Sequence, residues 1–471
     1  PCPTDQASDG SSIRTSSKNT KSNMNGEKEM PPVTRGMIRT TLLSAIIGTA
    51  VEWYDFYLYA TAAAVIFNKL FFPSYSHLIG TLLAYATFAV GFFARPVGGV
   101  VFGRFGDRIG RKRVLVITLL LMGGSTTAIG LLPTSMQIGI WAPILLVVLR
   151  AIQGFGSGAE YAGAVLMTIE YAPANRRGLY GAVPYVGVAA GLLLSLVSFS
   201  WASALPQQEF VAWGWRIPFL LSALVVALGM LLRSTLRETP VFEHLRALGH
   251  TSRAPLRDLF AVARREIFCA WGARLGDNSL AYIYESFIIV YATQQLDIPR
   301  PRILSALMVS AALQFLTVPL FGWLSDRVGR KPVYFGGAVL SGLFVFPFFA
   351  MLRTRNTFML YAALFVVSSV AKIMMTSAQS PWFAEMFPAS VRYTGFSVAR
   401  EVTSPLSGGI APIIATALLA AGGGSPHLVA WYVVALACIT AISVACGPET
   451  RGRSLDTETA AIQTAVSARE S

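Results

Sequence analysis

The sequence predicts an all-α polytopic membrane protein with twelve transmembrane helices in two six-helix bundles. Composition excludes a soluble protein, because 54% of the 471 residues are hydrophobic and only 13% are charged, about half the charged fraction usual in soluble domains. A membrane-spanning helix needs roughly 20 apolar residues, and apolar runs of that length recur at near-regular spacing. The twelve expected spans cover residues 40–67, 78–102, 114–132, 141–165, 179–203, 216–235, 266–292, 303–325, 333–351, 358–380, 393–421 and 427–446.

The segments outside these spans define the expected domain organisation. Residues 1–36 are rich in Ser, Thr, Asn and charge, a composition that favours a disordered tail. The widest interruption, 237–265, is polar and rich in arginine, so we interpret it as a central cytoplasmic loop. It separates an N-terminal bundle, 37–236, from a C-terminal bundle, 266–447, and residues 448–471 form a second tail.

The distribution of basic residues predicts the orientation. Of the 38 Lys and Arg residues, 27 lie in the tails and alternate loops of one side, and five lie in the loops of the other side. Because loops rich in Lys and Arg remain in the cytoplasm, both chain ends are predicted to be cytoplasmic. The net charge of +14 then reflects topology, and no nucleic-acid partner is expected.

Short patterns occur twice along the chain. Residues 103–112 (Gly-Arg-Phe-Gly-Asp-Arg-Ile-Gly-Arg-Lys) return 219 residues later as 322–331 (Gly-Trp-Leu-Ser-Asp-Arg-Val-Gly-Arg-Lys). The pattern Glu-x2-Pro-x3-Arg that begins at Glu170 returns at Glu385, after the equivalent span. We therefore predict a tandem duplication with both copies in one orientation. Such parallel repeats place a substrate site between the halves, near the membrane midplane.

The duplicated segment has the features of a conformational gate. Its first glycine lets adjoining helices approach closely. Asp107 and Asp326 can each cap the N-terminus of a neighbouring helix or pair with the arginines that follow, and such a contact would break and re-form as the halves rock. The residues assigned to this gate are Gly103, Asp107, Arg108, Gly110, Arg111, Lys112, Gly322, Asp326, Arg327, Gly329 and Arg330.

These patterns resemble signatures of the major facilitator superfamily. The duplicated segment, residues 150–156 (Arg-Ala-Ile-Gln-Gly-Phe-Gly) and residues 448–454 (Pro-Glu-Thr-Arg-Gly-Arg-Ser) are similar to three of its motifs. A narrower resemblance is to the metabolite:proton symporter family, which includes permeases for shikimate, α-ketoglutarate and citrate and the proline/betaine transporter. Residues 40–455 are covered, and the narrower motifs lie at 52–56, 94–99, 158–161, 213–219 and 238–243.

Eleven ionisable residues lie inside the predicted spans, where a charge costs about 2.5–3.5 kcal/mol at a helix centre. Glu52 and Asp55 share a face of the first span with Tyr59. Glu52 lies about twelve residues into the span, which is roughly 18 Å at the helical rise and near the midplane. A proton-coupling carboxyl needs such a site, and pairing with an arginine is the alternative for both acids. The family resemblance favours Asp55 and Glu52 as proton-linked and adds Glu160, for which a gate role is the alternative.

A basic residue of the fourth span is the first candidate substrate ligand. Arg150 could bind a carboxylate through its bidentate fork, or influence proton binding by an acid of the first span. A static ion pair with Glu52 or Asp55 is the alternative. Arg95, beside Pro96 and close to the first gate segment, is expected to be structural.

The second half has its own polar stripes. Arg274 could pair with Asp277, three residues on. Lys372 has no acid on its own stripe, so a substrate anion or Glu401 is its expected partner, and one of the adjacent Arg400 and Glu401 should pack against a neighbouring helix. The complete set predicted to bind substrate is Arg150, Gln153, Tyr59, Tyr185, Arg274, Asn278, Lys372 and Gln379.

Together these features predict a secondary active transporter of the cell membrane rather than an enzyme. The sequence has no Gly-x4-Gly-Lys-Ser/Thr loop for ATP and no metal-ligand spacing, so no cofactor or metal is expected. The leading hypothesis is proton-coupled uptake of a small polar metabolite, an organic acid such as shikimate or a dicarboxylate, by alternating access. A proline/betaine-type zwitterion symporter, a drug–proton exporter and a non-transporting nutrient sensor are the alternatives. The expected partners are the substrate, protons and the lipid bilayer, with the chain acting as a monomer.

Overall fold

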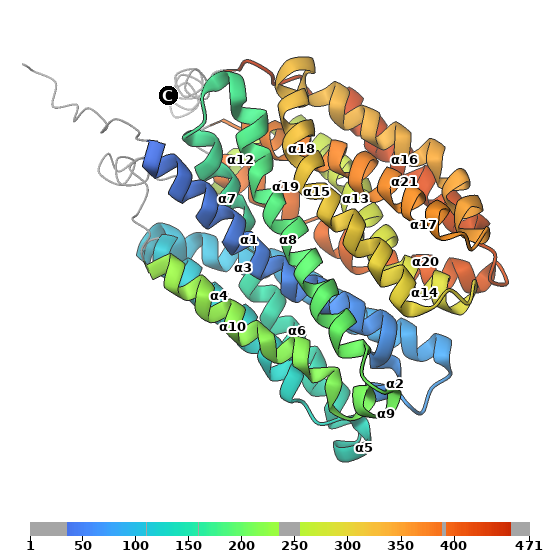
Figure 1. Cartoon of the computed structure of the whole chain (residues 1–471). Coiled ribbons are helices and arrows are strands. Elements are labelled where there is room, and N and C mark those ends of the chain that lie inside the picture. Colours follow the sequence, from blue (N-terminus) through green and yellow to red (C-terminus); the bar gives the residue numbers. More distant parts are fainter. Residues whose placement is uncertain (1–34, 110, 159, 235–254, 389–391, 454–471) are drawn as a thin grey trace, which may run out of the picture. The chain divides into compact units, whose positions relative to one another are not determined.

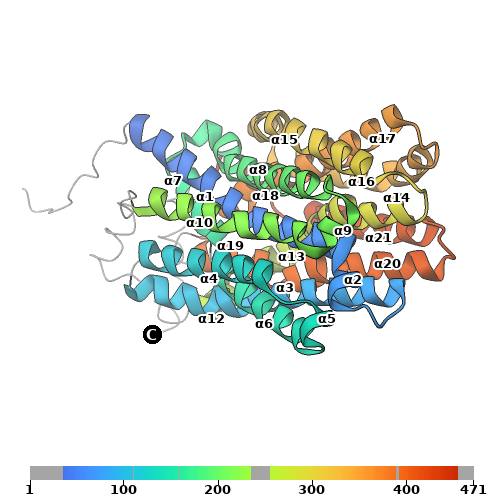
Figure 2. The same cartoon turned by 60° about the horizontal axis from the view of Figure 1, so that its bottom comes forward.

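Helices make up the regular structure of the chain. The computed structural model describes residues 35–453 apart from 110, 159, 235–254 and 389–391, and the described residues contain helices but no strands. Figures 1 and 2 show long helices that run beside one another in a common direction. Apolar runs explain this arrangement, because only a helix satisfies every backbone hydrogen bond within one membrane-spanning segment.

Six helical rods form the first half of the chain. Each rod covers most or all of one expected span, and several rods extend beyond that span at their ends. The rods are α1 Arg35–Ala62 with the π-helical η1 Ala63–Phe67 and α2 Asn68–Phe71, α3 His77–Ile109, α4 Arg111–Leu131, α6 Trp141–Ser157 with α7 Glu160–Glu170, α8 Arg177–Ser203, and α10 Arg216–Ser234. Short connecting elements are α5 Ser135–Ile138, η2 Ala174–Arg176, α9 Gln207–Glu209 and η3 Phe210–Gly214.

Six further rods form the second half. They repeat the order of the first half, with a π-helical segment interrupting three of them. The rods are α13 Arg264–Tyr282 with η4 Ile283–Phe287 and α14 Ile288–Gln294, α15 Arg300–Val328, α16 Arg330–Arg353, α17 Thr357–Leu364 with η5 Phe365–Ala371 and α18 Lys372–Met386, α19 Arg392–Glu401 with η6 Pro405–Gly409 and α20 Ala411–Ala421, and α21 His427–Cys446.

Length and apolar composition identify eight of the described helical segments as able to cross a membrane, or nine if one bent pair counts as a single span. The α4 rod counts only as a shorter apolar helix, Val116–Leu131, and the rods that begin with α1 and α13 are not among the candidates. Each of these rods carries buried ionisable side chains, Glu52 and Asp55 in one and Arg274 and Asp277 in the other. Across the described residues, the twelve-rod arrangement agrees with the two predicted bundles.

The two halves meet through pairs of equivalent rods. The fifth rod, α8, packs along the eighth, α15. The second rod, α3, contacts the eleventh through α19, η6 and α20. Because the second and eighth rods are repeat equivalents, as are the fifth and eleventh, one contact is the symmetry copy of the other, which is the geometry expected for parallel repeats.

The repeat is also visible in local backbone geometry. The π-helical segments η1 and η4 occupy the same place in the first and seventh rods, with starting residues 220 positions apart. Gly329 links α15 to α16 with a φ of 119°, a conformation that favours glycine. A β-carbon on Gly329 would lie 2.7 Å from the Glu449 carboxylate, so a side chain there would be strained and crowded.

Two expected boundaries change. Residues 1–34 lie outside the described residues, and α1 begins at Arg35 rather than after residue 36. The predicted loop 237–265 is described only from Pro255, where it forms a helix, α12 Pro255–Val262, before α13 begins at Arg264. Leu259 of α12 is buried, whereas Leu256 and Val262 are exposed. Packing of Leu259 therefore stabilises a helix in a segment whose composition is mostly polar.

Candidate functional site

A buried arginine joins the two halves near their centre. Arg95 of α3 donates from Nε to Glu401 Oε2 at 2.6 Å and from Nη2 to Glu401 Oε1 at 3.1 Å, and Nη2 also lies 3.2 Å from Glu52 Oε1. All three side chains are buried. We call Arg95, Glu52 and Glu401 the Arg95 triad. Removal of one partner of a buried ion pair typically costs about 3–5 kcal/mol, so the triad ties α1 and α3 to α19.

Arg150 of α6 forms its direct contacts with neutral groups. Its Nη1 donates to Gln153 Oε1 and its Nη2 donates to the carbonyl of Phe88 at 3.1 Å. Its guanidinium carbon lies 4.1 Å from the ring centroid of Tyr59, an arrangement favourable for a cation–π interaction. Among the carboxylates that the structure describes, none forms an ion pair with this fully buried side chain. Arg150 therefore retains its positive charge without a paired anion.

Asp55 of α1 shows the complementary situation. Ser222 of α10 donates to Asp55 Oδ1 at 2.9 Å, and Oδ2 has no hydrogen-bond partner. Asp55 is 1% exposed, and no basic residue in the described chain pairs with it. A buried carboxylate without a cation is costly, so a bound proton would relieve the cost of placing a carboxyl group here.

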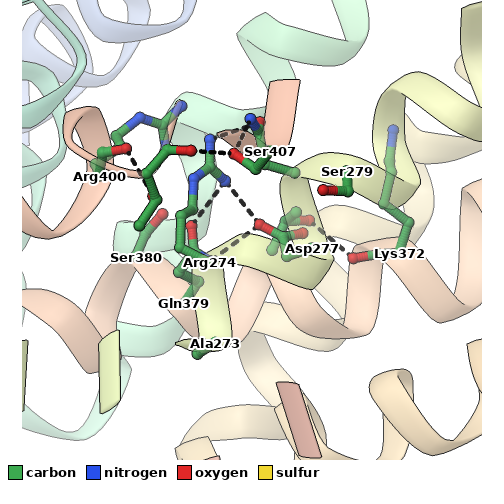
Figure 3. Close-up of polar contacts among 12 residues, drawn as sticks. Ala273, Arg274, Asp277, Ser279, Lys372, Gln379, Ser380, Arg400 and Ser407 are labelled. Atoms are coloured by element: carbon green, nitrogen blue, oxygen red, sulfur yellow. Dashed lines mark hydrogen bonds and ion pairs between the residues drawn. The ribbon is translucent and has the colours of Figure 1, made fainter. Parts of the chain in front are cut away.

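A polar cluster on the second half contains three predicted substrate ligands (Figure 3). Arg274 donates to Asp277 at 2.7 Å, to Gln379 at 3.1 Å and to Asn278 at 2.9 Å. Gln379 in turn donates to Asp277 at 2.9 Å, and Asn278 donates to Ser407 at 2.9 Å. The spacing of these residues on α13 places Arg274, Asp277 and Asn278 on one face, and α18 supplies Gln379.

Lys372 has a different partner from the expected ones. Its Nζ pairs with Glu285 of η4, and both side chains are fully buried. The expectation of Glu401 as its protein partner was wrong, because Glu401 is engaged by Arg95. Glu285 lies in the π-helical segment η4, and Lys372 directly follows the π-helical segment η5. The prediction of helix faces from the sequence assumes regular α-helices and does not allow for such segments.

A small cavity lies where the two halves meet. Its volume is about 10 Å³, room for about one water molecule, and it is lined by aromatic side chains of α1 and α8 and by polar side chains of α13. Tyr85 bonds to Ser286 at 3.1 Å and Tyr161 bonds to Ser380 at 3.1 Å, both across the two halves, and these bonds hold the halves together around a closed cavity. The lining residues, all at most 5% exposed, are Trp53, Tyr57, Tyr185, Arg274, Asp277, Asn278 and Ala281.

The second gate segment also joins the halves. Asp326 accepts hydrogen bonds from the backbone N–H groups of Gly178 at 2.7 Å and Leu179 at 2.9 Å, in the first turn of α8. Arg330 pairs with Asp326 at 2.8 Å and with Glu385 at 3.0 Å. We call Asp326, Arg330 and Glu385 the Asp326 latch. A carboxylate at a helix N-terminus is favoured by the helix dipole.

Close backbone approach makes this latch possible. A β-carbon on Gly322 would lie 2.8 Å from the side chain of Ala182 and 3.0 Å from the carbonyl of Gly178. Glu449 strengthens the region because it accepts bonds from the backbone of Arg330 and Lys331, each at 3.0 Å. The same residues that repeat in the sequence therefore form one connected contact between α8, α15, α16 and the chain after α21.

Comparisons with known proteins agree with this architecture. Residues 41–258 match the family described as "Sugar (and other) transporter", and residues 267–466 match the family described as "Major Facilitator Superfamily". The chain is 41% identical over 408 residues to the shikimate transporter of Escherichia coli, covering 86% of this chain and 93% of that protein. The chain belongs to the major facilitator superfamily. It is therefore a multi-pass membrane transporter and not an enzyme.

Other relatives in the superfamily differ in what they are described to carry. The chain is 37% identical to the inner membrane metabolite transport protein YhjE of Escherichia coli, covering 93% of this chain and 99% of that protein. It is 32% identical to the proline/betaine transporter of Salmonella typhimurium, covering 92% and 88% respectively. The proton:xylose symporter XylE aligns with a TM-score of 0.71 at 16% identity, covering 89% of this chain and 97% of that chain, which supports the fold.

The remaining predicted site residues of this superfamily member lie in different parts of the molecule. Tyr185 lines the cavity, whereas Tyr59 and Gln153 lie around Arg150. Glu160 is buried at the first residue of α7. Arg327 is an exposed residue whose guanidinium lies over Trp323. The side chains of the first gate segment lie outside the described residues, namely Gly103, Asp107, Arg108, Gly110, Arg111 and Lys112.

The predicted site set omitted several buried charges that the structure places centrally. The sequence predicts a structural role for Arg95, and the predicted set does not include Glu401, Asp277 or Glu285. Each is a charged residue within an apolar run, a signal that favours function or pairing. Arg400 also reaches the other half, with its guanidinium carbon 3.5 Å from the ring centroid of Tyr161. Helix spacing predicts the Arg274–Asp277 pair, but it could not identify the partners of Arg95 and Glu285, because Glu401 and Lys372 lie on other rods.

Proposed function

We propose that this transporter is a proton-coupled symporter that takes up a small organic acid by alternating access. The observation that carries the proposal is the closed cavity between the halves, which combines the guanidinium of Arg274 with aromatic walls. Secondary transporters bind substrate at the interface between their repeats. The structure is closed around this cavity, as expected for the intermediate between an inward-facing and an outward-facing transporter.

The lining favours a hydroxylated carboxylate. The guanidinium of Arg274 matches a carboxylate in shape and charge, and its Nε has no hydrogen-bond partner. Asp277 and Asn278 offer hydrogen-bonding atoms for hydroxyl groups, while Trp53 and Tyr57 offer flat surfaces for a ring. The similarity to a shikimate transporter supports the same chemistry, so shikimate is the first compound to test.

The proposed energy source is a proton gradient. Asp55 is a buried carboxyl group without a cationic partner, and it lies on the same rod as Glu52 of the Arg95 triad. Uptake of a proton by Asp55 would remove a costly buried charge and could favour reorientation of the loaded transporter. In this scheme the Asp326 latch lies at the cytoplasmic end, and both chain ends are on that side of the membrane, with the single chain as the working unit.

Transport into proteoliposomes tests this proposal. Purified protein should accumulate labelled shikimate when the external medium is acidic, and should exchange labelled for unlabelled shikimate without a gradient. Asp55→Asn should abolish accumulation while it retains exchange, because Asn keeps the shape and the Ser222 contact but cannot release a proton. Full accumulation by this variant would contradict the role of Asp55, and exchange of no organic acid by the wild-type protein would contradict the substrate class.

One observation favours a second candidate function. Asp277 Oδ1 has no hydrogen-bond partner and shares the cavity with Trp53, Tyr57 and Tyr185. Acidic and aromatic groups together can hold a quaternary ammonium, and a proline/betaine transporter is among the relatives. Glycine betaine that competes with shikimate for exchange, or replaces it, would favour zwitterion symport. Drug resistance without uptake would favour export, and ligand binding without exchange would favour a sensor.

A further inference from the structure

The ion pair of Lys372 and Glu285 lies beside the substrate cavity and has no role in the scheme above. Both side chains are fully buried. Glu285 belongs to the π-helical segment η4, and Lys372 directly follows η5. π-helical turns inside long helices occur frequently at functional sites. Because two such segments meet at this ion pair, the pair is a candidate functional site.

The surroundings of Glu285 are unequal at its two oxygens. Oε1 accepts from Lys372 Nζ, from Ser368 Oγ at 2.9 Å and from Gln314 Nε2 at 3.4 Å. Oε2 is buried and has no hydrogen-bond partner. A proton could therefore be added at Oε2 without the loss of a hydrogen bond.

Other titratable groups face Glu285 from three rods. Tyr57 of α1 and Tyr185 of α8 approach it from the first half, and Tyr282 precedes it on α13. Lys372 is the charged group in direct contact with it. The hydroxyl group of Tyr282 has no hydrogen-bond partner, and that of Tyr57 lies close enough to Glu285 to interact with it. Each hydroxyl can donate a hydrogen bond to an ionised Glu285 or accept one from a protonated Glu285.

Lys372 is one aromatic layer away from the cavity. Its Nζ lies 5.8 Å from the ring centroid of Tyr185, and Tyr185 and Tyr57 both line the cavity. The four-carbon stem of lysine is flexible and its ammonium has three rotatable donors. Arg274, in contrast, is already held by Asp277, Asn278 and Gln379.

We propose that Lys372 binds the carboxylate of the substrate and that a proton on Glu285 releases it to do so. This inference rests on the proposed transport of an organic acid. Before binding, the ionised Glu285 and Lys372 together carry no net charge. After one proton adds to Glu285 and one carboxylate pairs with Lys372, the net charge is again zero. Proton and substrate thus enter together, because either alone would leave an unpaired charge in a buried site.

Ligand binding to the full-length protein in nanodiscs tests this coupling. Shikimate is the probe, and titration calorimetry in buffers of different ionisation enthalpy reports both affinity and protons taken up. The wild-type protein should bind more tightly as pH falls and take up about one proton per shikimate. Glu285→Gln should bind with little pH dependence and take up no proton. Lys372→Gln should bind about tenfold more weakly or worse at every pH, the size expected for loss of a charge-assisted hydrogen bond.

Three controls keep the result interpretable. Glu209→Gln removes an exposed carboxylate of α9, distant in sequence from Glu285, and should behave as wild type. Glu285→Asp keeps the carboxyl group and should retain the pH dependence. If Glu285→Gln does not fold, the double variant Glu285→Gln/Lys372→Gln removes both charges and should bind weakly without pH dependence.

The outcomes separate this inference from the proposed function. Asp55→Asn should lose accumulation but keep pH-dependent binding, because Asp55 and Glu285 act on different steps. Suppose that the wild-type protein accumulates shikimate, and that the Glu285→Gln variant binds shikimate with the normal pH dependence and proton uptake. This result would overturn the inference and leave the proposed function intact. Failure of the wild-type protein to bind or exchange any organic acid would overturn both.

Discussion

The two halves of the transporter stabilise their buried charges in different ways. In the second half, Arg274 pairs with Asp277 and Lys372 pairs with Glu285, each within that half. In the first half, Arg150 is held by an amide, a carbonyl and aromatic rings, and Asp55 is held by a hydroxyl group. Asp55 can therefore take up a proton without breaking an ion pair, whereas Glu285, like Glu52 of the Arg95 triad, is held in one.

This difference has a functional meaning under alternating access. A carboxyl group that forms no ion pair exchanges a proton without breaking one, which suits a group that senses the gradient. A carboxylate that holds a lysine exchanges a proton only when another anion takes its place, which suits a group that detects the substrate. The Arg95 triad connects the two arrangements, since it places a first-half guanidinium on a second-half carboxylate.

The largest expected effect comes from removal of a paired cation. Arg95→Gln leaves Glu52 without its cation and leaves Glu401 with only its longer contact to Arg400, at 3.6 Å, and should destabilise the protein by about 3–5 kcal/mol. Arg150→Gln removes a cation that has only neutral partners and should cost less, about 1–3 kcal/mol. Thermal unfolding of the detergent-solubilised variants measures both.

The surface provides a matched control for this comparison. Arg355 pairs with Asp297 at 3.5 Å, and both side chains are more than half exposed. Exposed pairs contribute about 0–1 kcal/mol, so Arg355→Gln should unfold close to the wild-type temperature. Equal destabilisation by Arg95→Gln and Arg150→Gln would mean that Arg150 has an anionic partner and that the contrast between the halves is incorrect.

The second effect concerns the Asp326 latch. Asp326→Asn keeps the side-chain shape but removes the negative charge from the first turn of α8 and from Arg330. The closed state should lose about 1–3 kcal/mol relative to the state open at this end. Spin labels on the exposed Ala174 and Val328, one in each half, should then report longer distances.

A neighbouring residue is the control for the latch. Arg327→Gln changes an exposed charge one position away and should leave the distance distribution unchanged. If Asp326→Asn also leaves it unchanged, Asp326 does not hold the halves together. Asp107→Asn tests the equivalent segment of the first half, and a similar change there would indicate that both copies of the repeat act on the same equilibrium.

The sequence predicted the helical architecture better than the ionic contacts. Apolar runs predicted twelve spans, and the described residues form helical rods at those positions, of which eight or nine are long and apolar enough to cross a membrane. Span length and composition are local properties, which is why they could be predicted. The partner of Lys372 was wrong and that of Arg95 was not anticipated, since Arg95 and Glu401 lie 306 positions apart. Such pairs depend on how the halves pack. The π-helical segments are a second reason. A π-helical turn changes which residues of a helix share a face, so a spacing rule for a regular α-helix fails beyond it.

The predicted substrate ligands illustrate the same division. Arg274, Asn278 and Gln379 come together as their stripes suggest, because two of them share a regular helix and the third faces them from α18. Arg150 and Gln153 also contact each other on one helix, yet they lie in a different cluster from the cavity lining. A helical stripe predicts which residues share a face, and the neighbouring rods decide what that face contacts.

The smallest effect tests the charge state of the two carboxyl groups directly. Ser222 donates to Asp55 and Ser368 donates to Glu285, both at 2.9 Å and both from buried sites. A hydrogen bond to a neutral group contributes about 0.5–1.5 kcal/mol, and one to a charged group about 1.5–3 kcal/mol. If Asp55 carries a proton in the closed state and Glu285 does not, Ser368→Ala should lower the unfolding temperature more than Ser222→Ala. Equal losses at pH 7 would show that the two carboxyl groups share one charge state, and a larger loss for Ser222→Ala would reverse the assignment of proton sensing to the first half.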